Sequence, residues 1–334
     1  MKVYDRNGWV NWEYFCSLRR SFIMLVGARG VGKTYGLMKW LIENGKPFIY
    51  IRRLQAQLDM SGSESGNPFK KINSDLGIDI RPVKNKKMLE FRDRADNNKI
   101  IALGAALSTV ATIRGFDFSG YDFMLFDECV PMASEKPIKA EFDAFLNFYE
   151  TVNRNRELEN NDPVKCIMLG NANQLLNPYF TGWHFTKTAL KMISGHQMIY
   201  TTPDQTRTMV LLFDSPISRK KAKTALYKNA SAGFLSMALD NAFRTDATNI
   251  RSEPLKEYNH IVSVGDIGIY KHKSERRYFI SNVTSTPHYD DYGIKLRQFQ
   301  NDYWLLRSLY LDNKIMYFEN YENEILFREY LKLT

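Results

Sequence analysis

The chain has 334 residues, of which 44% are apolar and 13% aromatic, so it can bury the cores of two domains. Its formal net charge of +9 favours an anionic partner such as nucleic acid, although an excess of lysine also simply keeps a surface soluble. The three cysteines and five histidines lack metal-ligand spacing, so we expect neither a zinc site nor a disulfide framework, and a reducing cytosol is the simplest compartment. No apolar stretch is long enough to span a membrane, so we expect no membrane segment.

The first predicted elements are a buried strand over 22–26 and a helix that opens at 35–42. Between them the sequence reads Gly-Ala-Arg-Gly-Val-Gly-Lys-Thr, a complete G-x-x-x-x-G-K-[ST] phosphate-binding loop. A glycine-rich turn without a ligand is the alternative, but the flanking strand and helix are the context that the motif requires. The predicted nucleotide-binding residues are Gly27, Ala28, Arg29, Gly30, Val31, Gly32, Lys33 and Thr34.

The residue types of this loop suit a nucleoside triphosphate. Glycines let successive backbone N–H groups point at phosphate oxygens, and the helix N-terminus adds further donors. Lys33 reaches the β- and γ-phosphates and the Thr34 hydroxyl ligates Mg²⁺ in such a site, so we expect ATP and Mg²⁺ as cofactors. The mixed, aromatic residues 1–20 form a short lead-in that we expect to stack near the nucleotide base.

Further along the chain, strands are predicted over 47–51 and 99–103, with a flexible loop over 61–68 between them. The apolar run 121–126 is another buried strand, and it ends in Asp127 and Glu128. Beside a phosphate loop, Asp127 would complete the Mg²⁺ shell and Glu128 would act as general base on the attacking water. A strand that ends at a solvated acidic turn is the alternative. The second acid favours ATP hydrolysis coupled to motion over a kinase or switch GTPase.

A helix over 139–153 and a buried strand over 165–169 follow. Asn171 stands just after that strand, where it either contacts the γ-phosphate or caps a turn. Arg154 and Arg156 follow the helix and suit a finger that reaches a neighbouring subunit's phosphate, because guanidinium is planar and always charged. A solvated basic helix end explains these two arginines equally well from composition.

The pattern changes after a last strand over 209–213. Residues 218–243 are basic and helical, and hairpin-like strands follow over 261–264, 268–271 and 278–282. A strand over 314–318 and an amphipathic helix over 322–333 close the chain. The fold class is therefore α/β, with a mostly parallel sheet covered on both faces. The predicted domains are a P-loop ATPase over 1–215, a basic helical linker over 216–250 and a small α+β domain over 251–334.

Basic residues outside the phosphate loop are candidate contacts to nucleic acid, or else belong to a solvated face. These candidates are Arg52, Arg53, Lys84, Lys86, Lys87, Arg219, Lys220, Lys221 and Lys223.

The order of motifs resembles that of the DNA-packaging ATPases of small φ29-like tailed phages. The resemblance rests on residues 22–35, 48–53, 125–128, 151–157, 170–172, 177–180 and 239–243. The Arg-Asn-Arg-Glu stretch followed by Asn-Pro-Tyr-Phe is the selective part, because a phosphate loop alone is common to many families. The similarity fades over the last 80 residues, where only the hairpin pattern matches.

The resemblance implies an additional-strand (ASCE) ATPase that assembles as a homopentameric ring on a capsid's portal vertex in the host cytoplasm. It implies that the ring drives double-stranded DNA inward, docks on the portal and on a structural packaging RNA, and uses Arg154 as a trans-acting finger. Larger packaging motors carry a ribonuclease-H-type nuclease at this end, which needs a cluster of acids. Here Asp266 and the pair Asp290-Asp291 are available, but Asp266 lies in a predicted turn and no convincing third acid sits on a strand, so we expect a degenerate nuclease used for docking.

Two other function classes compete with a packaging motor. A P-loop helicase or helicase loader would share both acids and the finger but would require single-stranded DNA. A nucleic-acid-binding adaptor would use the C-terminal domain only to anchor the ring to RNA or portal. A small-molecule kinase is the least favoured class, because it has no use for the +9 charge or a basic connector.

Overall fold

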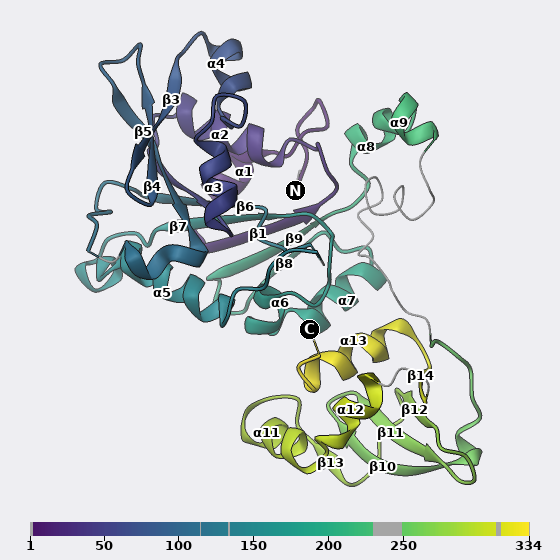
Figure 1. Cartoon of the computed structure of the whole chain (residues 1–334). Coiled ribbons are helices and arrows are strands. Elements are labelled where there is room, and N and C mark those ends of the chain that lie inside the picture. The colour runs from purple at the N-terminus through teal and green to yellow at the C-terminus, as the bar shows by residue number, and fades with distance from the viewer. Residues whose placement is uncertain (1–2, 114, 133, 230–248, 312–314, 334) are drawn as a thin grey trace. The chain divides into compact units, whose positions relative to one another are not determined.

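The computed structural model describes residues 3–113, 115–132, 134–229, 249–311 and 315–333, which form two compact units. One unit comprises the described residues of Met1–Gln174 and Lys191–Arg244, and the other those of Leu175–Leu190 and Thr245–Thr334 (Figure 1). The segment Leu175–Leu190 therefore leaves the range 1–215 that the sequence predicts as one ATPase domain. Local sequence patterns cannot reveal this, because the segment's partners, such as Asp266 for Lys187 and Glu329 for Thr186, lie far along the chain.

A nine-stranded sheet forms the centre of the first unit. Its strands are β1 (Phe22–Gly27), β2 (Phe48–Arg52), β3 (Ile80–Asn85), β4 (Met88–Asp93), β5 (Lys99–Ala106), β6 (Phe123–Asp127), β7 (Lys165–Gly170), β8 (Ile199–Thr201) and β9 (Arg207–Leu212). The spatial order is β3-β4-β5-β2-β6-β7-β1-β9-β8. Strands β5, β2, β6, β7, β1 and β9 run parallel, and β3, β4 and β8 pair antiparallel at the two sides. This arrangement confirms the predicted mostly parallel sheet.

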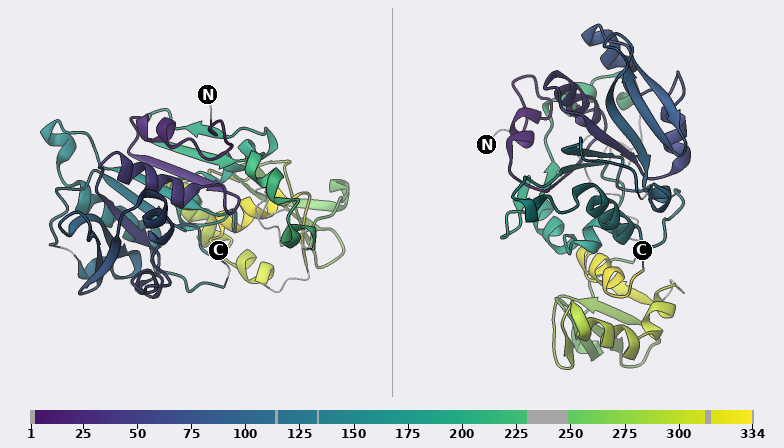
Figure 2. Two further views of the ribbon diagram at one scale, coloured as in Figure 1. Left: turned by 90° about the horizontal axis from the view of Figure 1, so that it is seen from above. Right: turned by 90° about the vertical axis from the view of Figure 1, so that its left-hand side faces the viewer.

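The central strands are apolar on both faces because helices cover both faces (Figure 2). On one face, Ile23 and Leu25 of β1 belong to a core cluster shared with α1 (Trp12–Ser17) and α2 (Lys33–Glu43). On the other face, Phe126 of β6 stacks on Phe145 of α5 (Glu141–Asn153), with ring centroids 5.9 Å apart. Burial of these aromatic and aliphatic side chains fixes the sheet as the rigid support of the site.

The strand order brings three predicted site segments to one edge of the sheet. Strands β1, β7 and β6 are parallel neighbours in that order, so their carboxyl ends meet at the same edge. Val26 pairs in register with Gly170, and Asp127 pairs with Leu169. The phosphate loop, the acid pair and Asn171 therefore converge, which is where open α/β sheets bind ligands.

Several elements of the first unit were not predicted from the sequence, or lie within the range predicted as one long helix. These are α3 (Gln55–Ser61), α4 (Lys70–Leu76), the 3₁₀ helices η1 (Leu107–Thr112) and η2 (Arg156–Glu159), α8 (Pro216–Lys221) and α9 (Ala225–Lys228). The predicted helix over 218–243 is interrupted between α8 and α9, and the rest of the predicted linker falls on residues 230–248, outside the described part of the chain.

The second unit contains a five-stranded sheet of order β13-β10-β11-β12-β14. Its elements are α6 (Pro178–Gly182), the start of α7 (Thr186–Ser194), η3 (Leu255–Glu257), β10 (Tyr258–Val264), β11 (Ile267–His272), β12 (Tyr278–Ser281), β13 (His288–Tyr289), α11 (Gly293–Asp302), α12 (Leu305–Leu311), β14 (Met316–Phe318) and α13 (Tyr321–Tyr330). The predicted hairpins and last helix are confirmed, whereas α11 and α12 were not predicted. Across the described ranges, no helix is long and apolar enough to cross a bilayer.

Candidate nucleotide-binding site

The phosphate loop turns sharply between β1 and α2. Gly30 and Gly32 have φ values of 68° and 84°, in the left-handed region that side chains rarely adopt. Space is limiting as well, because a Cβ on Gly32 would come within 3.0 Å of the Trp9 ring. Gly32 is the N-cap of α2, so the helix begins at Lys33 and directs its unpaired amides toward the loop.

Lys33 is buried, and its ammonium group lies inside the loop. Nζ donates to the carbonyl oxygens of Gly27 and Ala28 at 2.8 and 2.7 Å, and to Asn171 Oδ1 at 3.1 Å. Burial lowers the pKa of Lys33 to about 8. A cavity of about 330 Å³ beside it is lined by the loop, the acid pair and Asn171. These contacts place Asn171 beside Lys33, while the contact of either side chain with a nucleotide phosphate stays a prediction.

Thr34 and Asp127 form the candidate magnesium site. The Thr34 hydroxyl donates to Asp127 Oδ1 at 2.7 Å, and burial raises the pKa of the Asp127 carboxyl. Mg²⁺ prefers oxygen ligands and usually binds through one or two protein groups together with substrate phosphates. A hydroxyl and a carboxylate side by side, next to a phosphate loop, therefore fit the ion.

Arg52 is part of this site, which corrects its prediction as a DNA contact. Its Nη1 lies 3.0 Å from Asp127 Oδ2, and its Nη2 lies 2.6 Å from Glu128 Oε2. Glu128 has a φ of 51°, a strained conformation for a residue with a side chain, and its side chain is 49% exposed. Arg52 thus holds the predicted general base by a charge-assisted hydrogen bond.

Arg53 is buried, so its prediction as a DNA contact is wrong. Its Nε and Nη2 both donate to the Glu141 carboxylate at 2.7 Å, and Nη1 pairs with Glu135. A buried guanidinium needs such partners because an unpaired charge in the interior is costly. Arg53 therefore ties the end of β2 to the start of α5.

Lys221 also differs from its prediction as a DNA contact. Its Nζ donates to the carbonyl oxygen of Arg29 at 2.7 Å, so α8 lies against the phosphate loop. The other basic candidates are exposed, and their contact with DNA stays a prediction. They are Lys84, Lys86 and Lys87 around the turn between β3 and β4, and Arg219, Lys220 and Lys223 on and after α8.

The aromatic lead-in lies beside the phosphate loop. Trp12 Nε1 donates to the Gly32 carbonyl at 3.1 Å, and the 42% exposed Trp9 lies against the same glycine. This position agrees with the expected proximity to the nucleotide, while stacking on the base stays a prediction.

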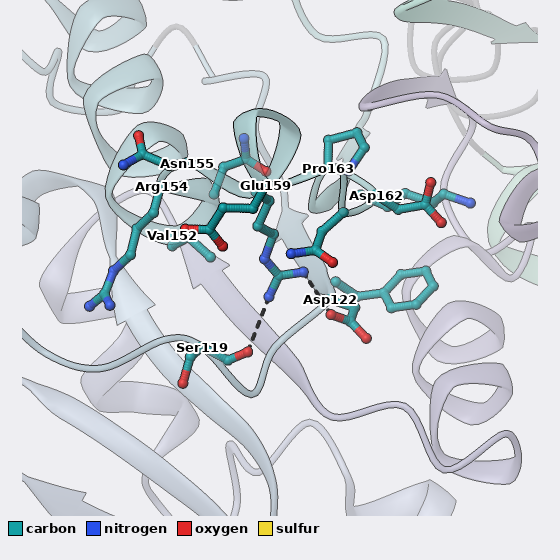
Figure 3. Close-up of a pocket in the computed structure, with 13 residues that line it drawn as sticks. Ser119, Asp122, Val152, Arg154, Asn155, Glu159, Asp162 and Pro163 are labelled. Atoms are coloured by element: carbon teal, nitrogen blue, oxygen red, sulfur yellow. Dashed lines mark hydrogen bonds and ion pairs between the residues drawn. The ribbon is translucent and has the colours of Figure 1, made fainter.

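Arg154 and Arg156 lie at the amino end of β6, where Arg154 lines a separate cavity of about 730 Å³ (Figure 3). Arg156 Nη1 donates to Asp122 Oδ1 at 2.7 Å, and Asp122 directly precedes β6. A strand rises about 3.3 Å per residue, so Asp122 and Asp127 lie roughly 16 Å apart. An arginine side chain is shorter than this, so Arg154 does not reach the phosphate loop of its own chain.

Comparison with known proteins identifies the family. A sequence model of the podovirus DNA encapsidation protein (Gp16) family matches residues 4–326. The chain belongs to this family. The DNA packaging protein of Bacillus phage B103 is 26% identical over 254 residues, which cover 74% of this chain and 72% of that protein. The DNA packaging protein of Bacillus phage phi29 is 24% identical over 266 residues, covering 78% and 73%.

Solved structures of packaging motors share the fold of this encapsidation protein. The Phi-28 gp11 DNA packaging motor matches with a TM-score of 0.57 and 19% identity over 99% of both chains. The bacteriophage Phi-29 viral genome packaging motor assembly matches with a TM-score of 0.58 and 22% identity, over 96% of this chain and 99% of that one. The predicted resemblance is thus confirmed: the protein is a viral DNA encapsidation protein, similar to the DNA packaging protein of phage phi29.

Proposed function

We propose that this encapsidation protein hydrolyses ATP with Mg²⁺ and uses the energy to move double-stranded viral DNA into a preformed capsid. The observation that carries the proposal is the convergence of the phosphate loop, Asp127, Glu128 and Asn171 at one edge of the sheet. Strand β7 between β1 and β6 supports membership of the additional-strand (ASCE) class of P-loop ATPases.

Each residue of the site has a chemical role in this proposal. The loop amides and Lys33 bind phosphate oxygens, and Thr34 and Asp127 hold Mg²⁺, which neutralises charge on the phosphates when bound. Glu128 exchanges its bond to Arg52 for a water molecule and accepts a proton from it. Asn171, already bonded to Lys33, contacts the γ-phosphate and responds to its loss.

Arg154 completes the site of a neighbouring subunit. It stands at the edge of the sheet opposite its own phosphate loop, and its side chain is 54% exposed. A head-to-tail contact would bring this edge of one chain against the nucleotide edge of the next, and such contacts close into rings. We propose a homopentameric ring at the portal vertex of the capsid, in the host cytoplasm.

Charge distribution supports a division of labour between the two units. Lysines plus arginines equal aspartates plus glutamates over residues 251–334, so the whole excess of +9 falls on residues 1–250. Duplex DNA is a polyanion, so the first unit is the better candidate for gripping it. Residues 251–334 have no net charge, and RNA is a polyanion. This favours docking of the C-terminal domain on the portal protein over docking on the structural packaging RNA.

The C-terminal domain is proposed as a degenerate, ribonuclease-H-like nuclease that no longer cuts. In the residues described, no three His, Cys, Asp or Glu side chains are grouped to hold a metal ion. Asp266 and Asp291 instead face the ammonium group of Lys187, whose Nζ pairs with Asp266 and lies 3.6 Å from Asp291 Oδ2. A lysine among the acids occupies the place that a cation would need.

ATPase stimulation by different nucleic acids tests the proposal. Turnover is measured without nucleic acid, with duplex DNA, with single-stranded DNA of equal length, and with duplex DNA plus proheads carrying the structural RNA. We expect the last condition to give the highest turnover and duplex to exceed single-stranded DNA, with the Lys33→Ala variant inactive throughout. Stronger stimulation by single-stranded DNA would contradict the packaging mechanism and support a helicase or helicase loader.

A further inference from the structure

The segment between α5 and β7, residues 154–164, carries two arginines in unlike surroundings. The Arg154 side chain is 54% exposed, and its contacts are long: 3.7 Å from Nη2 to Asp117 Oδ1 and 3.5 Å to the carbonyl oxygen of Phe116. The Arg156 side chain is only 16% exposed. The first arginine is therefore available to a partner, whereas the second is committed within its own chain.

Arg156 makes three hydrogen bonds to the segment that leads into β6. Its Nη1 donates to Asp122 Oδ1 at 2.7 Å, and its Nη2 donates to the carbonyl oxygens of Ser119 and Tyr121 at 3.2 and 3.1 Å. A planar guanidinium held by three acceptors has a fixed position and orientation, which a lysine could not match. These bonds fasten the loop to the amino end of β6.

The backbone at Arg154 needs such support. Arg154 is the C-cap of α5, with φ 48° and ψ −132°, a conformation that residues with side chains rarely adopt. Such a conformation persists only where surrounding contacts impose it. The buried Asn153 side chain closes the loop from one side by accepting from Val164 N at 2.8 Å, and Arg156 holds it from the other.

We propose that Arg156 is a positioning residue that presents Arg154 to the nucleotide of the adjacent subunit. Arg156 bonds Asp122 and holds the strained turn, while the Arg154 side chain points away from Asp122 (Figure 3) and is 54% exposed. It also attaches the finger to β6, whose other end carries Asp127 and leads to Glu128. Strand β6 of one subunit thus carries the acids of that subunit's own site at one end. At its other end it supports the arginine that enters the neighbouring subunit's site. This inference rests on the proposed trans-acting role of Arg154.

Positioning predicts a particular kinetic pattern in assembled motors. A misplaced finger no longer stabilises the transition state, so Arg156→Ala should lower kcat on the order of 10²-fold and leave KM for ATP unchanged. Arg156→Lys should recover part of the rate, because it keeps the charge but not the three-bond fork. Asp122→Asn should lose less, since both carbonyl bonds remain. Glu159 lines the same cavity, and its side chain makes no hydrogen bond or ion pair with the described residues. Glu159→Ala is therefore the control, and we expect it to keep wild-type turnover.

The double variant Arg154→Ala/Arg156→Ala decides between positioning and independent action. If Arg156 works through Arg154, the double variant should turn over ATP no more slowly than Arg154→Ala alone. A further loss that multiplies the two single effects would overturn the proposal. Ring formation and thermal unfolding of each variant are measured alongside. If Arg156→Ala does not fold, Arg156→Lys and Asp122→Asn are each combined with Arg154→Ala, and the same comparison is made with these double variants.

The outcome also separates this inference from the proposed function. Wild-type turnover by Arg154→Ala would reject the finger itself. A defective Arg154→Ala with wild-type kinetics in both Arg156→Ala and Arg156→Lys would leave the finger standing and reject only the positioning role.

Discussion

At the scale of single residues, Arg52 and Arg53 show how neighbours in sequence acquire unrelated roles. Arg52 bridges the Asp127 and Glu128 carboxylates at the nucleotide edge, while Arg53 is enclosed by Glu141 and Glu135. Both guanidinium groups lose water on folding, and ion pairs with carboxylates offset the free-energy cost of that loss. Composition alone could present them only as positive charges, which is why the sequence suggested DNA.

Glu128→Gln isolates the role of the general base. The amide keeps the size of the side chain but cannot accept the proton, while Thr34 and Asp127 still hold the metal. We expect nucleotide affinity to stay near wild type and turnover to fall by about 10²- to 10⁴-fold. Equilibrium binding of a fluorescent ATP analogue and steady-state hydrolysis check the two quantities, and wild-type turnover would show that another group is the base.

The depressed pKa of Lys33 predicts that ATP affinity depends on pH. Burial lowers this pKa to about 8, so the ammonium group loses its proton as pH rises through that value in the nucleotide-free protein. Because only the charged form attracts phosphate, affinity for ATP should fall about tenfold between pH 7 and pH 9. The pH dependence that comes from titration of ATP itself is the same for Lys33→Met, so the two proteins are compared. The ATP affinity of Lys33→Met should change less with pH than that of the wild type. Equal pH profiles for the two proteins would contradict the role given to the ammonium group.

At the scale of secondary-structure elements, the β3–β4 hairpin is the feature best placed for DNA. It lies at the far side of the sheet from β1, and its tip carries exposed Lys84, Lys86 and Lys87. Lys86 adopts the positive φ of 54° that a tight turn requires. Three exposed cations on one short turn form a compact contact for a phosphate backbone.

Neutralising the hairpin tip should weaken DNA binding without affecting basal ATP hydrolysis. We expect Lys84→Ala/Lys86→Ala/Lys87→Ala to reduce the slope of log affinity against log salt by about 0.9 for each lysine that contacts a phosphate. The matched control replaces three exposed lysines of the charge-balanced unit, Lys256, Lys271 and Lys273, and should keep the wild-type slope. Equal slopes for wild type and the hairpin variant would remove the hairpin from the DNA contact.

The elements also show which parts of the structure the sequence could predict. The loop over residues 27–34 and the Asp127-Glu128 pair follow local patterns whose meaning depends on a few adjacent residues, and both lie as expected. Arg52 and Lys221 reach the same site across 76 and 192 residues, and no local pattern marks such pairs. The β3–β4 hairpin escaped notice because its lysines and asparagine suit a solvated loop as well as an edge strand.

At the scale of the whole molecule, one unit carries the candidate nucleotide-binding site, and the other pairs Asp266 and Asp291 with its own Lys187. Lys187 belongs to Leu175–Leu190, the segment that leaves the ATPase sequence and joins the C-terminal unit. Asn171 precedes this segment by only a few residues. The chain thus leads from Asn171, the partner of Lys33, to Lys187, which contacts the acids of the second unit.

The neutralised acids predict that the full-length protein has no metal-dependent nuclease activity. Incubation with duplex DNA and Mn²⁺ should leave the DNA intact, because the described acids form no group for two metals. Cleavage that disappears in Asp266→Ala would overturn this expectation, whereas cleavage that persists in that variant would point to a contaminating enzyme.

The central claim, that each active site is completed by its neighbour's Arg154, is tested most directly by mixing two inactive variants. Arg154→Ala lacks the finger and Glu128→Gln lacks the base, so each alone should hydrolyse ATP on the order of 10³-fold more slowly than wild type. In mixed rings, Glu128→Gln subunits can donate fingers to Arg154→Ala sites that retain the base. We predict that DNA-dependent hydrolysis reappears over intermediate mixing ratios. Absence of turnover at every ratio, in rings shown to contain both variants, would mean that Arg154 does not act in trans.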